Sequence, residues 1–144
     1  MATQATYDDA NLILRLYEIR REEKMRAARE WFAKNFRPKS FAELNQLCPA
    51  GSQENAYYRM VVTYYEMAAS FITSGVLSSE LFFQSGLELM LVWERIRPIL
   101  PELRETFKHP GLYKNLEAVS KLYVQYLDRQ GPDAYQAFAA RVGG

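Results

Sequence analysis

The stretch that decides the fold is QENAYYRMVVTYYEMAASFITS, residues 53–74. Its polar side chains recur at spacings of four, three, four and three, namely Arg59, Thr63, Glu66, Ser70 and Thr73. In a helix this spacing places them in one narrow line, and apolar or aromatic side chains cover the rest of the circumference. Such a helix needs neighbours on several sides. The sequence therefore predicts that residues 53–74 lie at the centre of a helical bundle.

Outside this stretch, apolar residues also recur at spacings of three and four, and no segment alternates with the two-residue period of a strand. The pattern predicts helices over residues 8–35, 40–47, 53–74, 79–97, 101–108 and 112–129, followed by a short helix that begins after Pro132. We expect an all-α fold, an irregular bundle of five to seven helices with the third and fourth at its centre. No linker rich in Pro, Gly or Ser interrupts the chain, which predicts one domain over residues 1–144, with frayed ends at 1–7 and 142–144.

Composition limits the cellular setting. The chain has 18 Lys and Arg against 17 Asp and Glu, so its net charge is +1, which argues against a dedicated binder of nucleic acid or anionic membranes. Cys48 is the only cysteine, so an intramolecular disulfide cannot form, and a cytoplasmic protein is expected. The longest stretch without charge, residues 67–79, is shorter than the roughly 20 residues that span a bilayer. We expect no membrane span.

The residues that carry common chemistries are scarce. Metal sites need several convergent His, Cys, Asp or Glu ligands, whereas the chain has one histidine, His109, and one cysteine. Cys48 lies in a predicted turn with no histidine near it in sequence to activate it. The glycines form no phosphate-binding loop. The sequence therefore predicts no catalytic residue, no metal, no cofactor and no enzymatic activity.

The polar line of residues 53–74 offers one candidate ligand site. Arg59, Thr63 and Glu66 share a face of a helix that is otherwise apolar, and charges there need compensation or a cavity. Together with Arg104 they are expected to line a polar pocket in a small-ligand-binding or regulatory domain. The alternatives are a solvated line or a network of structural ion pairs.

The first predicted helix offers a candidate interface. Its first half is apolar around much of its circumference, with Leu12, Ile13, Leu16, Tyr17 and Ile19. An exposed apolar half-helix favours aggregation, so it either folds back on the bundle or packs against a second chain. Our leading functional hypothesis is a non-enzymatic protein-interaction or scaffold domain that is homodimeric through this helix.

The same predicted helix is locally basic. A surface with Arg20, Arg21, Lys24, Arg26 and Arg29 suggests a weaker alternative, binding of a nucleic-acid phosphate backbone. Interleaved acidic residues such as Glu22 and Glu23 favour a solvated face instead.

Several short motifs between Tyr64 and Arg104 carry a resemblance. They are Ala68-Ala69-Ser70-Phe71, Gly75-Val76-Leu77, Glu80-Leu81-Phe82, Trp93, Arg97-Pro98 and Arg104. This part of the chain resembles a family of small bacterial helical domains of unknown function. In many relatives the N-terminal part is a membrane anchor, whereas this chain has the charged segment 8–35 there. The resemblance implies an all-helical fold and no particular activity.

Overall fold

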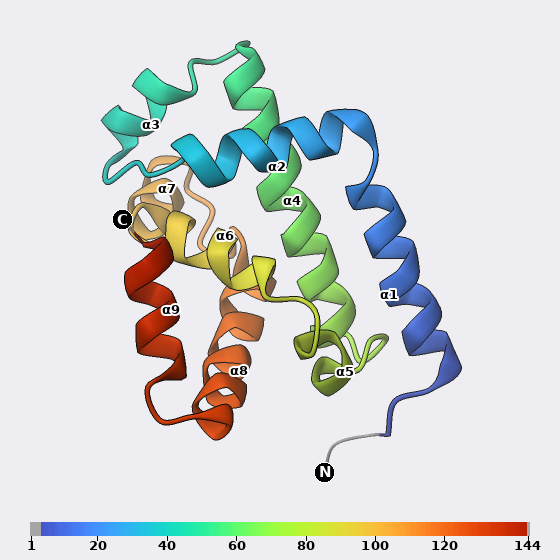
Figure 1. Ribbon diagram of the computed structural model, residues 1–144. Coiled ribbons are helices and arrows are strands. Elements are labelled where there is room, and N and C mark those ends of the chain that lie inside the picture. Colours follow the sequence, from blue (N-terminus) through green and yellow to red (C-terminus); the bar gives the residue numbers. More distant parts are fainter. Residues whose placement is uncertain (1–3, 144) are drawn as a thin grey trace.

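The computed structural model describes residues 4–143, and this part of the chain is all-α, as predicted. It contains nine helices (Figure 1): α1 (Tyr7–Arg20), α2 (Glu23–Asn35), α3 (Phe41–Leu47), α4 (Gln53–Thr73), α5 (Ser79–Phe83), α6 (Glu88–Ile96), α7 (Leu100–Thr106), α8 (Lys114–Gln130) and α9 (Ala134–Val142). The expected number of five to seven is wrong, because two of the predicted helices are each broken in two.

The first of these breaks lies at Glu22. Arg21 still has helical backbone angles (φ −81°, ψ −13°), whereas Glu22 is extended (φ −57°, ψ 141°). The Glu22 carboxylate accepts a hydrogen bond from the Met25 amide at 2.9 Å and so caps α2. Helical periodicity does not reveal this break, because the charged residues on both sides of it are good helix formers. The chain turns there, so α2 packs against α4 while α1 lies along the edge of the bundle (Figure 1).

The second break lies at Gly86. A Cβ atom built on this residue would lie 2.4 Å from the Phe82 ring, and that ring is held in the core with 6% of its surface exposed. Glycine also weakens a helix interior. The turn separates α5, which packs against α1, from α6, which packs against α4, α8 and α9. Only the second half of the predicted fourth helix is therefore central.

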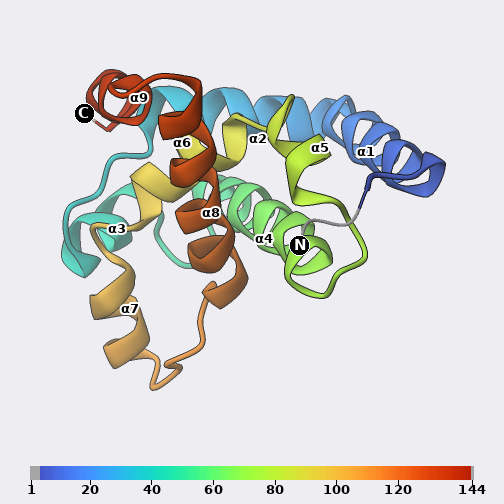
Figure 2. The same cartoon turned by 90° about the horizontal axis from the view of Figure 1, so that it is seen from below.

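Helix α4 occupies the centre predicted for residues 53–74. It packs against α2, α8 and α6 and crosses the middle of the bundle in both views (Figures 1 and 2). Its buried side chains are Tyr58, Val61, Val62, Tyr64, Tyr65, Ala68, Ala69 and Ile72. Its polar line lies on the remaining, more exposed side, so the helical pattern of this stretch correctly identified the buried face.

Residues at both described ends of the bundle make specific contacts. Thr6 and Asp9 form a capping box at the start of α1, and Val142 is the last residue of α9 and packs on the core. The other residues expected to fray include 1–3 and 144, which lie outside the described residues. Among residues 4–143, no helix combines the length and the apolar character needed to cross a membrane.

Candidate functional site

Glu66, the central residue of the predicted pocket, caps another helix. Its carboxylate accepts hydrogen bonds from the Leu116 amide at 2.8 Å, the Asn115 amide at 3.4 Å and the Asn115 side chain at 2.9 Å. These residues form the first turn of α8, whose own N-cap, Tyr113, has a left-handed backbone (φ 56°) and no capping side chain. Glu66 therefore satisfies backbone donors that α8 leaves open and places its charge at the positive end of that helix.

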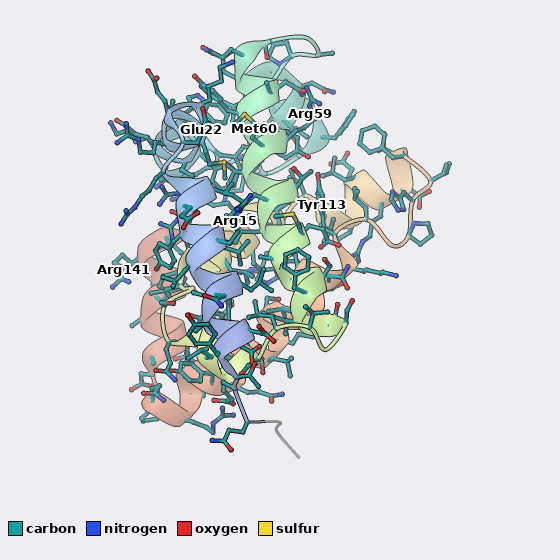
Figure 3. The ribbon with its side chains drawn as sticks, turned by 90° about the vertical axis from the view of Figure 1, so that its right-hand side faces the viewer. Arg15, Glu22, Arg59, Met60, Tyr113 and Arg141 are labelled. Atoms are coloured by element: carbon teal, nitrogen blue, oxygen red, sulfur yellow. The ribbon has the colours of Figure 1, made fainter. Side chains whose placement is uncertain are left out.

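The other candidates for that pocket also have partners within the chain. Arg59 lies on the exposed side of α4 (Figure 3), and its Nε donates to Asn55 Oδ1 at 2.8 Å. The Thr63 hydroxyl donates to the Arg59 carbonyl one turn earlier.

Arg104 acts at a different place, in the connection between α7 and α8. It donates to the Leu112 carbonyl through Nε at 3.0 Å and through Nη2 at 2.8 Å, and to Glu117 at 3.0 Å. The structure does not bring Arg104 into a common pocket with Arg59, Thr63 and Glu66, and none of the four lines either cavity described below. The contacts of Glu66 cap a helix, and those of Arg104 hold the connection between α7 and α8 in place.

The candidate interface of α1 packs largely on its own bundle. Leu16 is 4% exposed, and Leu12 and Ile13 are half-buried against the core. The half-buried Tyr17 donates its hydroxyl to the Ser85 carbonyl at 3.0 Å, and Ile19 remains 39% exposed. Within this single chain, the apolar half of α1 therefore packs on its own bundle.

Two of the five cations of the basic segment point inward, toward Glu88 of α6. Arg29 donates to both Glu88 carboxylate oxygens at 2.7 and 2.9 Å, the Tyr65 hydroxyl donates at 2.6 Å, and Arg20 Nε lies 3.9 Å away. Burial alone would raise the pKa of Glu88, but the hydrogen bonds from Arg29 and Tyr65 and the two arginine charges outweigh it, so its pKa lies below the usual value. Arg20 and Arg29 thus serve the fold rather than a basic outer face.

A small cavity lies beside this cluster. Its volume is about 20 Å³, large enough for one water molecule, and its lining includes Ile13, Tyr64, Phe82 and Arg20. Arg20 Nε is buried and has no hydrogen-bond partner among the described residues. The Arg20 guanidinium instead lies over the Tyr17 ring, 4.7 Å from its centroid. The end of α1 is therefore anchored less completely than its middle.

Helix α6 carries two further buried charges, Glu94 and Arg95. Arg95, 4% exposed, has no carboxylate partner among residues 4–143; it donates to the carbonyls of Phe32, Ala33 and Phe36 at 3.0–3.2 Å, and to that of Val142. These carbonyls lie at the C-terminal ends of α2 and α9, where helix dipoles favour a cation. Burial and the charge of Arg37 lower the pKa of Arg95 to about 10, so it remains protonated at neutral pH.

The residues considered for metal or nucleophilic chemistry lie apart. Cys48 is buried, and burial raises the pKa of its thiol to about 11, which makes it a poor nucleophile at neutral pH. His109 is exposed in the connection after α7. Within the described part of the chain, no group of three or more His, Cys, Asp or Glu side chains could hold a metal ion.

The larger cavity is an open hollow at the end of the bundle where α1 begins, which we call the N-terminal groove. It has a volume of about 430 Å³ and is lined by residues of the segments 4–9 and 75–80, with Ile72 and Leu122. Asp9 links its two walls, because its carboxylate accepts from the Thr6 amide at 2.7 Å and from the Ser78 amide at 2.7 Å. These backbone hydrogen bonds lower the pKa of Asp9. The groove is thus fixed at the meeting point of the starts of α1 and α5.

The sequence did not identify this groove or the Glu88 cluster. The line Glu80, Gln84 and Glu88 has helical spacing, yet the break at Gly86 separates Glu80, on the groove, from Glu88, which is partly buried and pairs with Arg29. One feature of the sequence could have indicated the groove. Gly75 ends α4 with a left-handed backbone (φ 80°), and Ser78, three residues later, is the N-cap of α5. Such a connection turns the chain sharply and leaves Val76 exposed.

A family model described as a domain of unknown function, DUF4760, matches residues 5–123. The match confirms the resemblance found between Tyr64 and Arg104 and extends it from the start of α1 into α8. Comparisons with curated proteins and with solved structures find no match. Because residues 5–123 make up well over half of the 144 residues, the chain belongs to the DUF4760 family.

Proposed function

We propose that this chain is a non-enzymatic protein-interaction module, and that the N-terminal groove binds a basic, amphipathic segment of a partner polypeptide. The observation that carries the proposal is the groove itself, which combines exposed aliphatic side chains with exposed carboxylates. Its volume of about 430 Å³ lies within the range of roughly 300–1,000 Å³ that is typical of binding sites.

The apolar part of the groove consists of Val76 and Leu122. Val76 is 62% exposed in the connection between α4 and α5, and Leu122 is 44% exposed on α8. Both line the same hollow, together with the more buried Ile72 and Leu77. An aliphatic side chain of a partner that entered the groove would remove this surface from water, which favours association.

The charged part of the groove is acidic. Asp8 is exposed at the start of α1, and Glu80, at the start of α5, is half-exposed and pairs with Arg129 at 2.9 Å. Asp9 adds a third carboxylate, which is already hydrogen-bonded within the chain. Three carboxylates against one guanidinium give the groove a negative charge that attracts Lys or Arg side chains and repels phosphates. The preferred partner is therefore a basic polypeptide rather than a nucleic acid or an anionic membrane.

The test uses two synthetic peptides of equal length, one of alternating Leu and Lys and one of alternating Leu and Glu, added to ¹⁵N-labelled full-length protein. We expect the Leu/Lys peptide to shift amide resonances of residues 8–9, 75–80 and 122, and the Leu/Glu peptide to leave them unchanged. The shifts should weaken as salt rises, because exposed charges are screened.

Two charge reversals provide the matched comparison. Asp8→Lys, in the groove, should weaken binding of the Leu/Lys peptide by about tenfold, equivalent to ~1.4 kcal/mol, through lost attraction and new repulsion. Glu105→Lys makes the same change on α7, at an exposed position outside the groove lining, and should leave the affinity nearly unchanged. Equal effects of the two variants, or shifts confined to other surfaces, would contradict the proposal.

A further inference from the structure

The connection between α1 and α2, which we call the joint, departs from helical geometry at a single backbone angle. Arg21 has helical angles, and the φ of Glu22 (−57°) is also helical, so only its ψ of 141° departs from a helix. The segment contains no glycine or proline, and its residues Arg20-Arg21-Glu22-Glu23-Lys24 are all good helix formers. Rotation about this one bond would join α1 and α2 into the continuous helix over residues 8–35 that the sequence pattern predicts.

Helix α1 lies at the edge of the bundle (Figure 1), where it packs against α2 and α5 and is hydrogen-bonded to α4 and to the turn after α5. The Tyr64 hydroxyl donates to the Leu16 carbonyl at 2.6 Å, and the Tyr17 hydroxyl donates to the Ser85 carbonyl. At its start Asp9 accepts from the Ser78 amide. None of these three hydrogen bonds involves α2, so they do not depend on the angle between α1 and α2.

We infer that α1 exchanges between two copies of this chain. In the exchanged dimer Glu22 is helical, α1 extends away from its own bundle, and the α1 of each chain lies on residues 64–88 of the other. Every contact of α1 with those residues is rebuilt with the same partners, so the dimer gives up only the packing of α1 against its own α2. The incomplete anchoring of Arg20, whose buried Nε has no hydrogen-bond partner among the described residues and lies 3.9 Å from Glu88, favours release at the end of α1 next to the joint.

The balance between the two forms depends on the Glu22 cap, because this hydrogen bond exists only in the broken form. Loss of such a cap changes an equilibrium constant by roughly fivefold per helix, and hence by roughly 25-fold for a dimer with two joints. Glu22→Ala should therefore favour the dimer. Glu23→Ala, at an adjacent exposed residue that provides no N-cap, is the matched control and should have little effect.

A second variant should have the opposite effect. Glu23 occupies the first position of α2, where proline is well tolerated, and a proline there requires Glu22 to keep its extended angle. In the continuous helix the same proline would clash with the preceding turn, a penalty on the order of a hundredfold. Glu23→Pro should therefore hold the chain as a monomer without disturbing the bundle.

The experiment is size-exclusion chromatography with light scattering on the full-length protein and the three variants, over a range of concentrations, after incubation in mild urea and its removal. Circular dichroism confirms that each variant is folded. We expect a larger dimer fraction for Glu22→Ala than for the wild type and Glu23→Ala, and the smallest for Glu23→Pro. A dimer that Glu23→Pro leaves unchanged, or a folded Glu22→Ala that stays monomeric at the highest concentration, would overturn the inference. Neither result bears on peptide binding in the N-terminal groove.

Discussion

Replacement of Glu66 by alanine tests whether this residue serves the fold or a ligand. The change removes an acceptor from the Asn115 and Leu116 amides in the first turn of α8. A lost helix cap costs about 1 kcal/mol, and loss of its charge at the helix N-terminus costs a further ~0.5 kcal/mol. Leu116 is fully buried, so its amide cannot readily bind water instead, which increases the cost. We expect a total loss of about 2 kcal/mol in the free energy of unfolding.

In a domain of this size, such a loss lowers the melting temperature by roughly 4–8 °C, which thermal unfolding followed by circular dichroism measures directly. Glu66→Gln keeps an acceptor without the charge and should lose about half as much. Glu105→Ala removes a carboxylate whose side chain is 83% exposed and should change the stability by less than ~0.5 kcal/mol. An unchanged or raised melting temperature for Glu66→Ala would refute the capping argument, because residues kept for a ligand often reduce stability. The predicted pocket at Arg59 and Glu66 would then explain the residue better.

Two further variants test the core. Gly86→Ala places a methyl group against the Phe82 ring and should lower the free energy of unfolding in urea by about 1–3 kcal/mol. A second substitution, Phe82→Leu, should restore part of this loss. Full stability of Gly86→Ala would contradict the close approach of Gly86 to the Phe82 ring. Glu88→Gln should be less stable than the wild type at pH 7. Because the pKa of Glu88 is lowered in the folded state, this difference in stability should shrink as the pH falls from about 5 toward 3. A difference in stability that does not vary with pH would count against the ion-pair cluster.

The sequence predicted the elements that depend on local pattern. The apolar circumference of residues 53–74 identified the central helix, and the starts expected at residues 40 and 53 agree with those of α3 and α4 to within one residue. The polar line of α4 lies on the less buried side of the helix. Its role could not be predicted, because the partner of Glu66 lies about fifty residues away, at the start of α8. Pattern within a helix shows which face is polar, but not what meets that face.

The features that were missed depend on breaks between helices. The break at Glu22 turns α2 across α4, and the break at Gly86 turns α6 into the core. Together they bring Arg29 and Glu88 into contact, although the two residues are 59 positions apart. Composition within a helix does not encode such a pairing. The N-terminal groove arises in the same way, from the meeting of the starts of α1 and α5 with the end of α4.

The neighbouring charges Glu94 and Arg95 make α9 a necessary part of the bundle. The Tyr135 hydroxyl donates to Glu94 at 2.6 Å, and the Arg95 guanidinium donates to the Val142 carbonyl, so each of these two charges has a partner on α9. The family match ends at residue 123, before α9 begins. A polypeptide cut there would lack the groups of α9 that bind these two charges. The packed bundle of this protein therefore includes a helix that lies beyond the segment by which its family is recognised.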